Sequence, residues 1–162
     1  MQRVFVVLLF CSLLLCSCGK REYGILSYQD KNVEAVCLVN EKYKVKIDKT
    51  EEKSTITVLE PENARGISFE IYGDYVVLSS GETVIQAEKS SLGGVCALGS
   101  IFSQREEMLT GAREADDGSV LTFCDGGTTY VFTMGENDLP KRVKITSDAY
   151  EYKVEICSIS VT

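Results

Sequence analysis

The side chains of this sequence that could do covalent chemistry are its cysteines, because the chain contains seven cysteines and no histidine. Histidine is the commonest general base and the commonest metal ligand, so its absence speaks against a catalytic triad and a histidine-bound metal. No two of the later cysteines form a Cys-x-x-Cys pair, and their wide spacing predicts no zinc site. We therefore expect no enzyme activity, no metal and no cofactor. The cysteines stand at positions 11, 16, 18, 37, 96, 124 and 157.

Cys18 stands at the end of a segment with the layout of a secretory signal. Arg3 is followed by an apolar run from Val4 to Leu15, and small residues come next. The ending Leu15-Cys16-Ser17-Cys18 resembles the lipobox of bacterial lipoproteins. The resemblance implies that residues 1–17 are removed and that the sulfur of Cys18 carries a diacylglyceryl group with fatty acyl chains such as palmitate. It also implies a partner, the cell membrane, which the lipid anchor would engage on its extracytoplasmic face.

The segment has two other interpretations. An ordinary secretory signal cut after Cys18 would leave a free secreted protein. An uncleaved membrane anchor would need about 20 apolar residues, and the run from Val4 to Leu15 is shorter. The lipoprotein interpretation divides the chain into a signal peptide (1–17), a lipidated tether and lead-in (18–32), and a single β-rich domain (33–162).

The charge of the chain excludes one class of partner. Without residues 1–17, 145 of the 162 residues remain, which suits one domain. Arg3 is the only charged residue removed. The remaining chain has 16 of the 17 Lys and Arg residues and all 24 Asp and Glu residues, which gives a net charge of −8. An acidic chain repels phosphate backbones, and we expect no nucleic-acid partner.

Most of the domain alternates apolar and polar residues with the period of a β-strand. Turn residues such as Gly73-Asp74 separate the segments, and the alternation slips after Ile156, which predicts a β-bulge. The expected fold is mainly β: an antiparallel meander of about eleven strands that forms an open curved barrel or sheet with one helix inserted. The strands are expected over residues 33–39, 43–48, 55–60, 67–72, 75–80, 83–87, 108–114, 119–124, 128–134, 142–146 and 150–161.

The inserted helix is expected over Ser90 to Gln104, where apolar residues recur at helical spacing. Its three glycines weaken it by about 1 kcal/mol each relative to alanine, so packing on the dry face of the sheet must hold it. Together, helix and sheet would present an apolar ligand-binding surface. The residues expected to form that surface are Ile47, Ile56, Val58, Phe69, Ile71, Leu92, Val95 and Phe102.

This layout resembles the outer-membrane lipoprotein carrier (LolA-like) superfamily. A long antiparallel meander, a lone helix and a lead-in from Pro61 through Gly66 to Phe69 carry the resemblance. It implies an open, curved β-barrel whose concave face holds acyl chains under helical lids. The alternative is a structural or sensory cell-envelope module that binds protein or peptidoglycan on its polar face. A carboxylate-based hydrolase is a third hypothesis, which the position of the paired carboxylates in predicted turns disfavours.

The four cysteines of the domain lie inside apolar segments. An even number in an exported protein permits two disulfides in three connectivities. Free cysteine is also among the most buried residue types. We favour buried, unpaired thiols for all four, which are Cys37, Cys96, Cys124 and Cys157.

Overall fold

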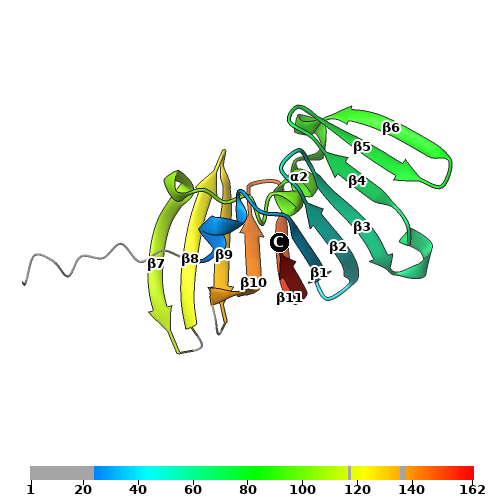
Figure 1. Ribbon diagram of the computed structural model, residues 1–162. Coiled ribbons are helices and arrows are strands. Elements are labelled where there is room, and N and C mark those ends of the chain that lie inside the picture. The colour runs from blue at the N-terminus through cyan, green and yellow to red at the C-terminus, as the bar shows by residue number, and fades with distance from the viewer. Residues whose placement is uncertain (1–23, 117, 136–137) are drawn as a thin grey trace, which may run out of the picture.

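The computed structural model describes residues 24–116, 118–135 and 138–162. The signal segment and Cys18 lie outside the described residues, so lipid attachment at Cys18 stays a prediction. Eleven strands form one antiparallel sheet, as the sequence predicts (Figure 1). They are β1 (Val33–Val39), β2 (Tyr43–Lys49), β3 (Ser54–Glu60), β4 (Ser68–Ile71), β5 (Tyr75–Ser80), β6 (Thr83–Glu88), β7 (Leu109–Ala115), β8 (Gly118–Asp125), β9 (Thr128–Met134), β10 (Pro140–Thr146) and β11 (Glu151–Val161).

The sheet consists of a first meander, β1 to β6, and a second meander, β7 to β11, which join where β1 pairs with β11. Its order is β6-β5-β4-β3-β2-β1-β11-β10-β9-β8-β7, so β1 and β11 lie side by side at its centre. The predicted irregularity in β11 is present: the pairing register shifts between Val36 and Cys37 of β1, opposite the stretch from Ile156 to Ser158. β6 and β7 are the two ends, and the sheet does not close into a barrel.

Short helices precede or connect the strands of the described residues. They are η1 (Gly24–Tyr28), η2 (Glu62–Ala64), η3 (Lys89–Leu92), α2 (Gly93–Gly99) and η4 (Glu106–Met108). The prediction of one helix from Ser90 to Gln104 is therefore too long at its C-terminal end. Ile101 and Phe102 are fully buried, but they lie in a turn after the helix. Their apolar side chains continue the helical spacing in the sequence although the backbone there is not helical.

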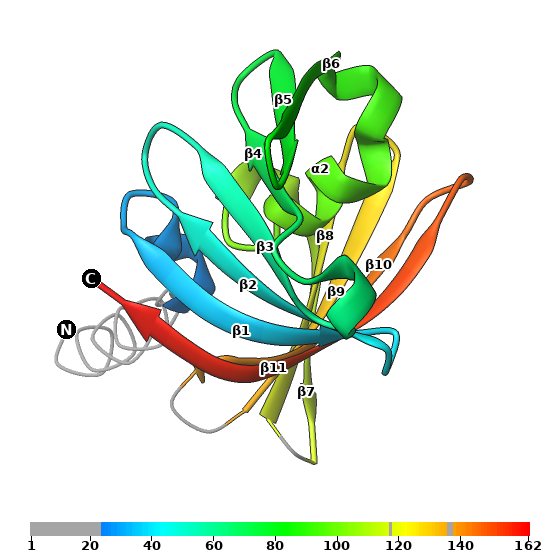
Figure 2. The same ribbon diagram turned by 90° about the vertical axis from the view of Figure 1, so that its right-hand side faces the viewer.

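The glycines of α2 permit close packing on both sides. A Cβ atom added to Gly94 would collide with the hydroxyl group of Tyr152 on β11, and one added to Gly99 would collide with Cδ1 of Ile71 on β4. The helix therefore bridges the concave side from β11 to β4, and a side chain at either glycine would require Tyr152 or Ile71 to shift. Figure 2 shows the sheet curving around α2.

The inner faces of both meanders and the helices share one hydrophobic core. Ile25 and Tyr28 of η1 are buried in it, and the rings of Tyr28 and Phe102 lie 6.4 Å apart between centroids. Lys49 ties η1 to β2, because its ammonium group donates to the backbone carbonyls of Tyr28 (2.7 Å), Gln29 and Lys31 (2.9 Å). Burial lowers the pKa of Lys49, while these carbonyls satisfy its protons at the end of a helix, where positive charge is favoured.

The four thiols of the domain are unpaired, as predicted, but only two are buried. Cys37 and Cys96 lie in the core. Burial, and secondarily the neighbouring Cys157, raises the pKa of the Cys37 thiol to about 12. Cys124 and Cys157 are exposed, so the burial prediction is wrong for them. Cys157 falls in the irregular stretch of β11, and Cys124 lies one residue before the end of β8.

Candidate functional site

A row of apolar side chains crosses the concave face of the first meander. The strand register aligns Ile47 of β2 with Ile56 of β3, then Phe69 of β4, Leu78 of β5 and Ile85 of β6. Directly opposed residues of neighbouring strands point to the same face of a sheet. We call these five residues the inner apolar row.

Exposure rises along the inner apolar row from the centre of the sheet to its edge. Ile47 is 0% exposed, Phe69 and Leu78 are half-buried, and Ile85 is 52% exposed. The row therefore begins inside the core and ends at solvent. Its outer part, on β4 to β6, presents apolar surface that the fold does not fully cover.

The segment η3–α2 lies beside this partly covered surface. α2 contacts β3 and β4, and η3 contacts β5 and β6. Leu92, at the end of η3, and Val95, in α2, are half-buried and pack against the core. The arrangement places a short, glycine-rich helical segment over the strands where the inner apolar row leaves the core.

The structure separates the eight residues predicted to bind a ligand into two groups. Phe69, Leu92 and Val95 stay half-buried at the rim beneath and within η3–α2. The other five are buried parts of the core, namely Ile47, Ile56, Val58, Ile71 and Phe102. Their role toward a ligand stays a prediction, and the fold places only the first group at the boundary with solvent.

Sequence reasoning missed Leu78 and Ile85, the outer members of the inner apolar row. Both lie in strands that the sequence predicts. The signal that could have found them is the pair of two-residue turns at Gly73-Asp74 and Gly81-Glu82, because a tight hairpin sets the register of its strands. Counting back from those turns aligns Leu78 with Phe69 on one side and with Ile85 on the other.

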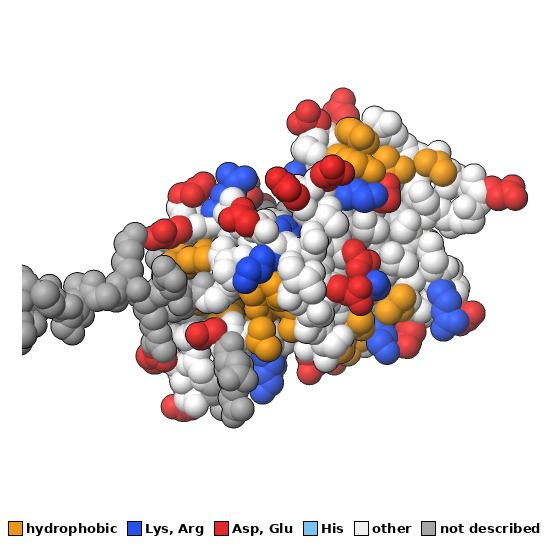
Figure 3. All heavy atoms as spheres, in the orientation of Figure 1, with side chains coloured by type: hydrophobic (Ala, Val, Ile, Leu, Met, Phe, Trp, Pro, Cys, Tyr) orange, Lys and Arg blue, Asp and Glu red, His pale blue; other side chains and the backbone are white. Residues whose placement is uncertain are grey.

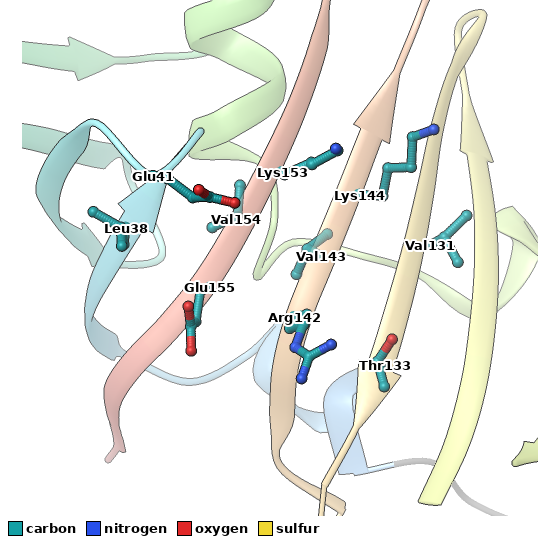
Figure 4. Close-up of a pocket in the computed structure, with 10 residues that line it drawn as sticks. All are labelled: Leu38, Glu41, Val131, Thr133, Arg142, Val143, Lys144, Lys153, Val154 and Glu155. Carbon is teal, nitrogen blue, oxygen red and sulfur yellow. The ribbon is translucent and has the colours of Figure 1, made fainter. Parts of the chain in front are cut away.

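A second candidate region is a recess of about 470 Å³ on the outer face of the sheet (Figure 4). Arg142 and Lys144 of β10 and Lys153 of β11 supply positive charge, and Glu41 and Glu155 supply negative charge. The mixed charges suit a polar group rather than an acyl chain. The recess is lined by Leu38, Glu41, Val131, Thr133, Arg142, Val143, Lys144, Lys153, Val154 and Glu155.

A third region is a polar recess of about 340 Å³ where β2 to β4 meet the end of α2. Lys53 in its wall donates to Glu70, which also accepts a hydrogen bond from the hydroxyl of Tyr72 at 2.9 Å. The bonds from Lys53 and Tyr72 lower the pKa of the Glu70 carboxyl below its ordinary value. Positively and negatively charged residues both line this recess, so it too offers a polar surface.

Two further observations concern metal binding and membrane crossing by the described residues. Among residues 24–116, 118–135 and 138–162, no group of three or more Cys, Asp or Glu side chains is placed to hold a metal ion. Within the same residues, no helix combines the length and the apolar character that crossing a bilayer requires.

Comparison with known proteins adds solved structures of similar shape. Neither a scan against protein-family models nor a search of curated proteins gave a match. An uncharacterized conserved protein from Thermus thermophilus superposes with a TM-score of 0.52 at 11% identity, over 85% of this chain and 83% of that one. At that identity, the likeness shows the fold alone.

Two further solved structures superpose with lower scores. One is a LolA superfamily protein from Nitrosomonas europaea, with a TM-score of 0.44 at 12% identity over 84% of this chain and 91% of that one. The other is a putative outer membrane lipoprotein-sorting protein domain from Vibrio parahaemolyticus, with a TM-score of 0.43 at 10% identity over 82% of this chain and 84% of that one.

Proposed function

We propose that this chain is an extracytoplasmic lipoprotein, anchored through lipid on Cys18, that binds an apolar ligand such as an acyl chain on the concave face of β3 to β6. The observation that carries the proposal is the exposure of the inner apolar row, which rises from 0% at Ile47 to 52% at Ile85. Exposed apolar surface that continues from a core and lies beside a cover is a candidate binding surface for an apolar ligand, and we call this surface the proposed groove.

The segment η3–α2 would serve as the cover of this groove. An isolated helix as short as α2 is not stable in water, so its contacts with the sheet hold it in place. An element held by apolar contacts opens at lower cost than the strands around it. A ligand on the outer part of the row would contact the half-buried Leu92 and Val95 and would compete with the sheet for them.

The proposed anchor would keep this groove close to the membrane. Gly24 opens η1, and η1 packs into the core through Ile25 and Tyr28. The segment from Cys18 to Gly24 reaches at most about 20 Å when fully extended. Acyl chains attached at Cys18 would provide stable anchoring, since two chains hold where one chain binds only marginally.

The test measures binding of a fluorescent fatty acid to the full-length protein and to two matched variants. Leu78→Glu places a carboxylate in the inner apolar row and should weaken binding about tenfold, because a charge in an apolar groove must be desolvated. Val77→Glu changes the neighbouring half-buried residue, which points to the opposite face of β5, and should leave binding unchanged.

Two results would contradict the proposal. The first is a fatty acid that binds both variants equally well, or that does not bind the wild-type protein. The second comes from native mass spectrometry of the protein purified from cells, if no lipid copurifies and added lipid does not bind. The anchor at Cys18 is tested separately by cell fractionation. The Cys18→Ala protein should move from the membrane fraction to soluble or unprocessed forms.

A further inference from the structure

β6 ends the sheet with the most exposed apolar residues among the described large hydrophobic side chains. Val84 is 67% exposed and Ile85 is 52% exposed, and no described strand pairs with the far side of β6. Hydrophobic side chains gather over β5 and β6 in Figure 3. Val84 and Ile85 are consecutive, so they point to opposite faces of the strand, and β6 presents apolar surface on both.

The backbone of β6 also offers a regular, unpaired edge. All six of its residues pair with β5 without a register shift. The amide of Lys89, next in the same register, donates to the carbonyl of Asp74 at 3.2 Å. Because backbone groups of an antiparallel strand alternate in direction, Thr83, Ile85 and Ala87 bond to β5, and Val84 and Gln86 direct their N–H and C=O groups outward.

The other end of the sheet lacks this regularity. β7 has a register shift between Leu109 and Gly111, and it carries the charged residues Arg113 and Glu114. Bulges and charges are devices by which natural edge strands avoid pairing with other chains. β6 has no bulge, lysine or proline, and its one charged residue, Glu88, stands at the end of the strand. The two ends are therefore built differently, and β6 is the end suited to accept a strand.

We propose that β6 binds an extended segment of a partner protein as an added strand, with apolar residues at the centre of the segment and basic residues at its ends. Added strands gain affinity from backbone hydrogen bonds and specificity from alternate side chains. The centre of the segment would cover Val84 and Ile85. Its basic ends would meet Glu82 and Glu88, which flank those residues and are exposed. The neighbouring Lys89 is among the residues that line the polar recess.

The same carboxylates disfavour a second copy of this chain in the register that would cover Val84 and Ile85 evenly. In an antiparallel pair of β6 strands centred on Ile85, Glu82 of each copy would lie opposite Glu88 of the other. Like charges that directly oppose each other across strands are destabilising. A basic segment instead neutralises both carboxylates, whichever direction it runs.

The test uses the full-length protein and the fluorescent peptide Lys-Thr-Val-Val-Val-Thr-Lys, with a charge-reversed peptide that has glutamate at both ends. The basic peptide should bind in the micromolar range, and amide NMR signals of Val84 and Gln86 should shift. The reversed peptide should bind about tenfold more weakly, and added salt should narrow the difference.

Gln86→Pro is the decisive variant, and Gln86→Ala is its matched control. Proline removes an N–H that faces outward and leaves the bonds to β5 in place, so thermal unfolding should change little. Gln86→Pro should weaken peptide binding about tenfold, while Gln86→Ala should keep it within about twofold. Gln86→Pro should also retain fatty-acid binding, which separates this proposal from the groove proposed above.

Four results would overturn the proposal. One is a basic peptide that does not bind, and another is equal binding by Gln86→Pro and the wild-type protein. The third is a set of NMR shifts centred on the outer recess or the concave groove instead of β6. The fourth is concentration-dependent dimerisation in sedimentation that Gln86→Pro abolishes, which would identify a second copy as the occupant.

Discussion

The inner faces of β8 to β10 and of β4 to β6 come from similar alternating sequences but end in different environments. On the first, Leu121, Phe132 and Ile145 are fully buried, and the rings of Phe123 and Phe132 meet edge to face at 5.5 Å between centroids. On the second, Ile71 and Val76 are buried, but along the inner apolar row Phe69 and Leu78 are half-buried and Ile85 is exposed. Alternation therefore predicts which face of a strand is apolar but not whether another element covers that face.

The cover comes from segments that the strand pattern does not describe. η1 and the turn at Phe102 place Tyr28 and Phe102 in the same core as the strands of the second meander. The segment η3–α2 extends over β3 to β6, and its glycines press against Tyr152 and Ile71 rather than against the outer strands. The first meander is thus covered near the centre of the sheet and open toward β6.

We call the covered inner face of β8 to β10 the closed region and the partly covered β4 to β6 the open region. The largest expected effect on stability comes from removing an aromatic ring from the closed region. Phe132→Ala should lower the free energy of unfolding by about 3–5 kcal/mol, because it leaves a cavity in a packed core. Phe69→Ala, in the open region, should cost about 1–2 kcal/mol, since the ring is only half-buried. Urea denaturation monitored by circular dichroism measures both. Equal losses would show that the two regions are covered alike.

The next effect concerns the contact that fixes α2 over β4. Gly99→Ala should lower the free energy of unfolding by about 1–3 kcal/mol, because the added methyl group collides with Cδ1 of Ile71. Ile71→Val removes that carbon atom, so the double variant should lose less than the sum of the two single losses. Chemical denaturation of the four proteins in this cycle gives the coupling energy.

Gly93→Ala is the control for this cycle. A methyl group at Gly93 would lie 3.7 Å from the Tyr150 ring, which is an ordinary contact. The change should be neutral or stabilising by up to about 1 kcal/mol, because alanine favours the helix. Additive losses for Gly99→Ala and Ile71→Val would mean that α2 does not press on β4, and the proposed cover of the groove would lose its support.

The fold was predictable because each strand carries its own signal. Alternation and turn residues such as Gly73-Asp74 are local, and they locate all eleven strands to within a few residues. The bulge in β11 is local as well, since the slip after Ile156 is visible in the sequence. The pairing of β1 with β11 is not local, because it joins residues more than a hundred positions apart, and no turn specifies it.

The candidate site was less predictable because burial depends on what covers each face. The sequence correctly selects Phe69 and Val95 as apolar residues of the sheet and the helix. It does not separate them from Ile47 and Phe102, which the fold places in the core. From the sequence, the glycines of α2 predict only a weak helix, whereas in the fold Gly94 and Gly99 lie close against the side chains of Tyr152 and Ile71. Such contacts follow from tertiary packing rather than from helix propensity.

The smallest expected effect concerns the charged cluster on the outer face of the open region. Hydrogen bonds from Lys53 and then Tyr72 lower the pKa of Glu70 in the folded protein. A carboxyl whose pKa is lower in the folded state contributes stability above its unfolded pKa, about 4.3, and loses that contribution as the pH falls through the folded value. About a third of each side chain in the Lys53–Glu70 ion pair is exposed, so solvent and salt screen it and the effect is small.

Glu70→Gln removes this charge and should therefore flatten the decline of stability as the pH falls from neutral into acid. Urea midpoints of the wild-type protein and the variant should differ at neutral pH and converge in acid. Glu62→Gln is the matched control, because its ion pair with Arg65 is open to solvent, with 82% of the Glu62 side chain exposed. That variant should follow the wild-type curve. Parallel curves for Glu70→Gln and the wild type would show that the Lys53–Glu70–Tyr72 cluster does not stabilise the open region, and that apolar contacts beneath it act alone.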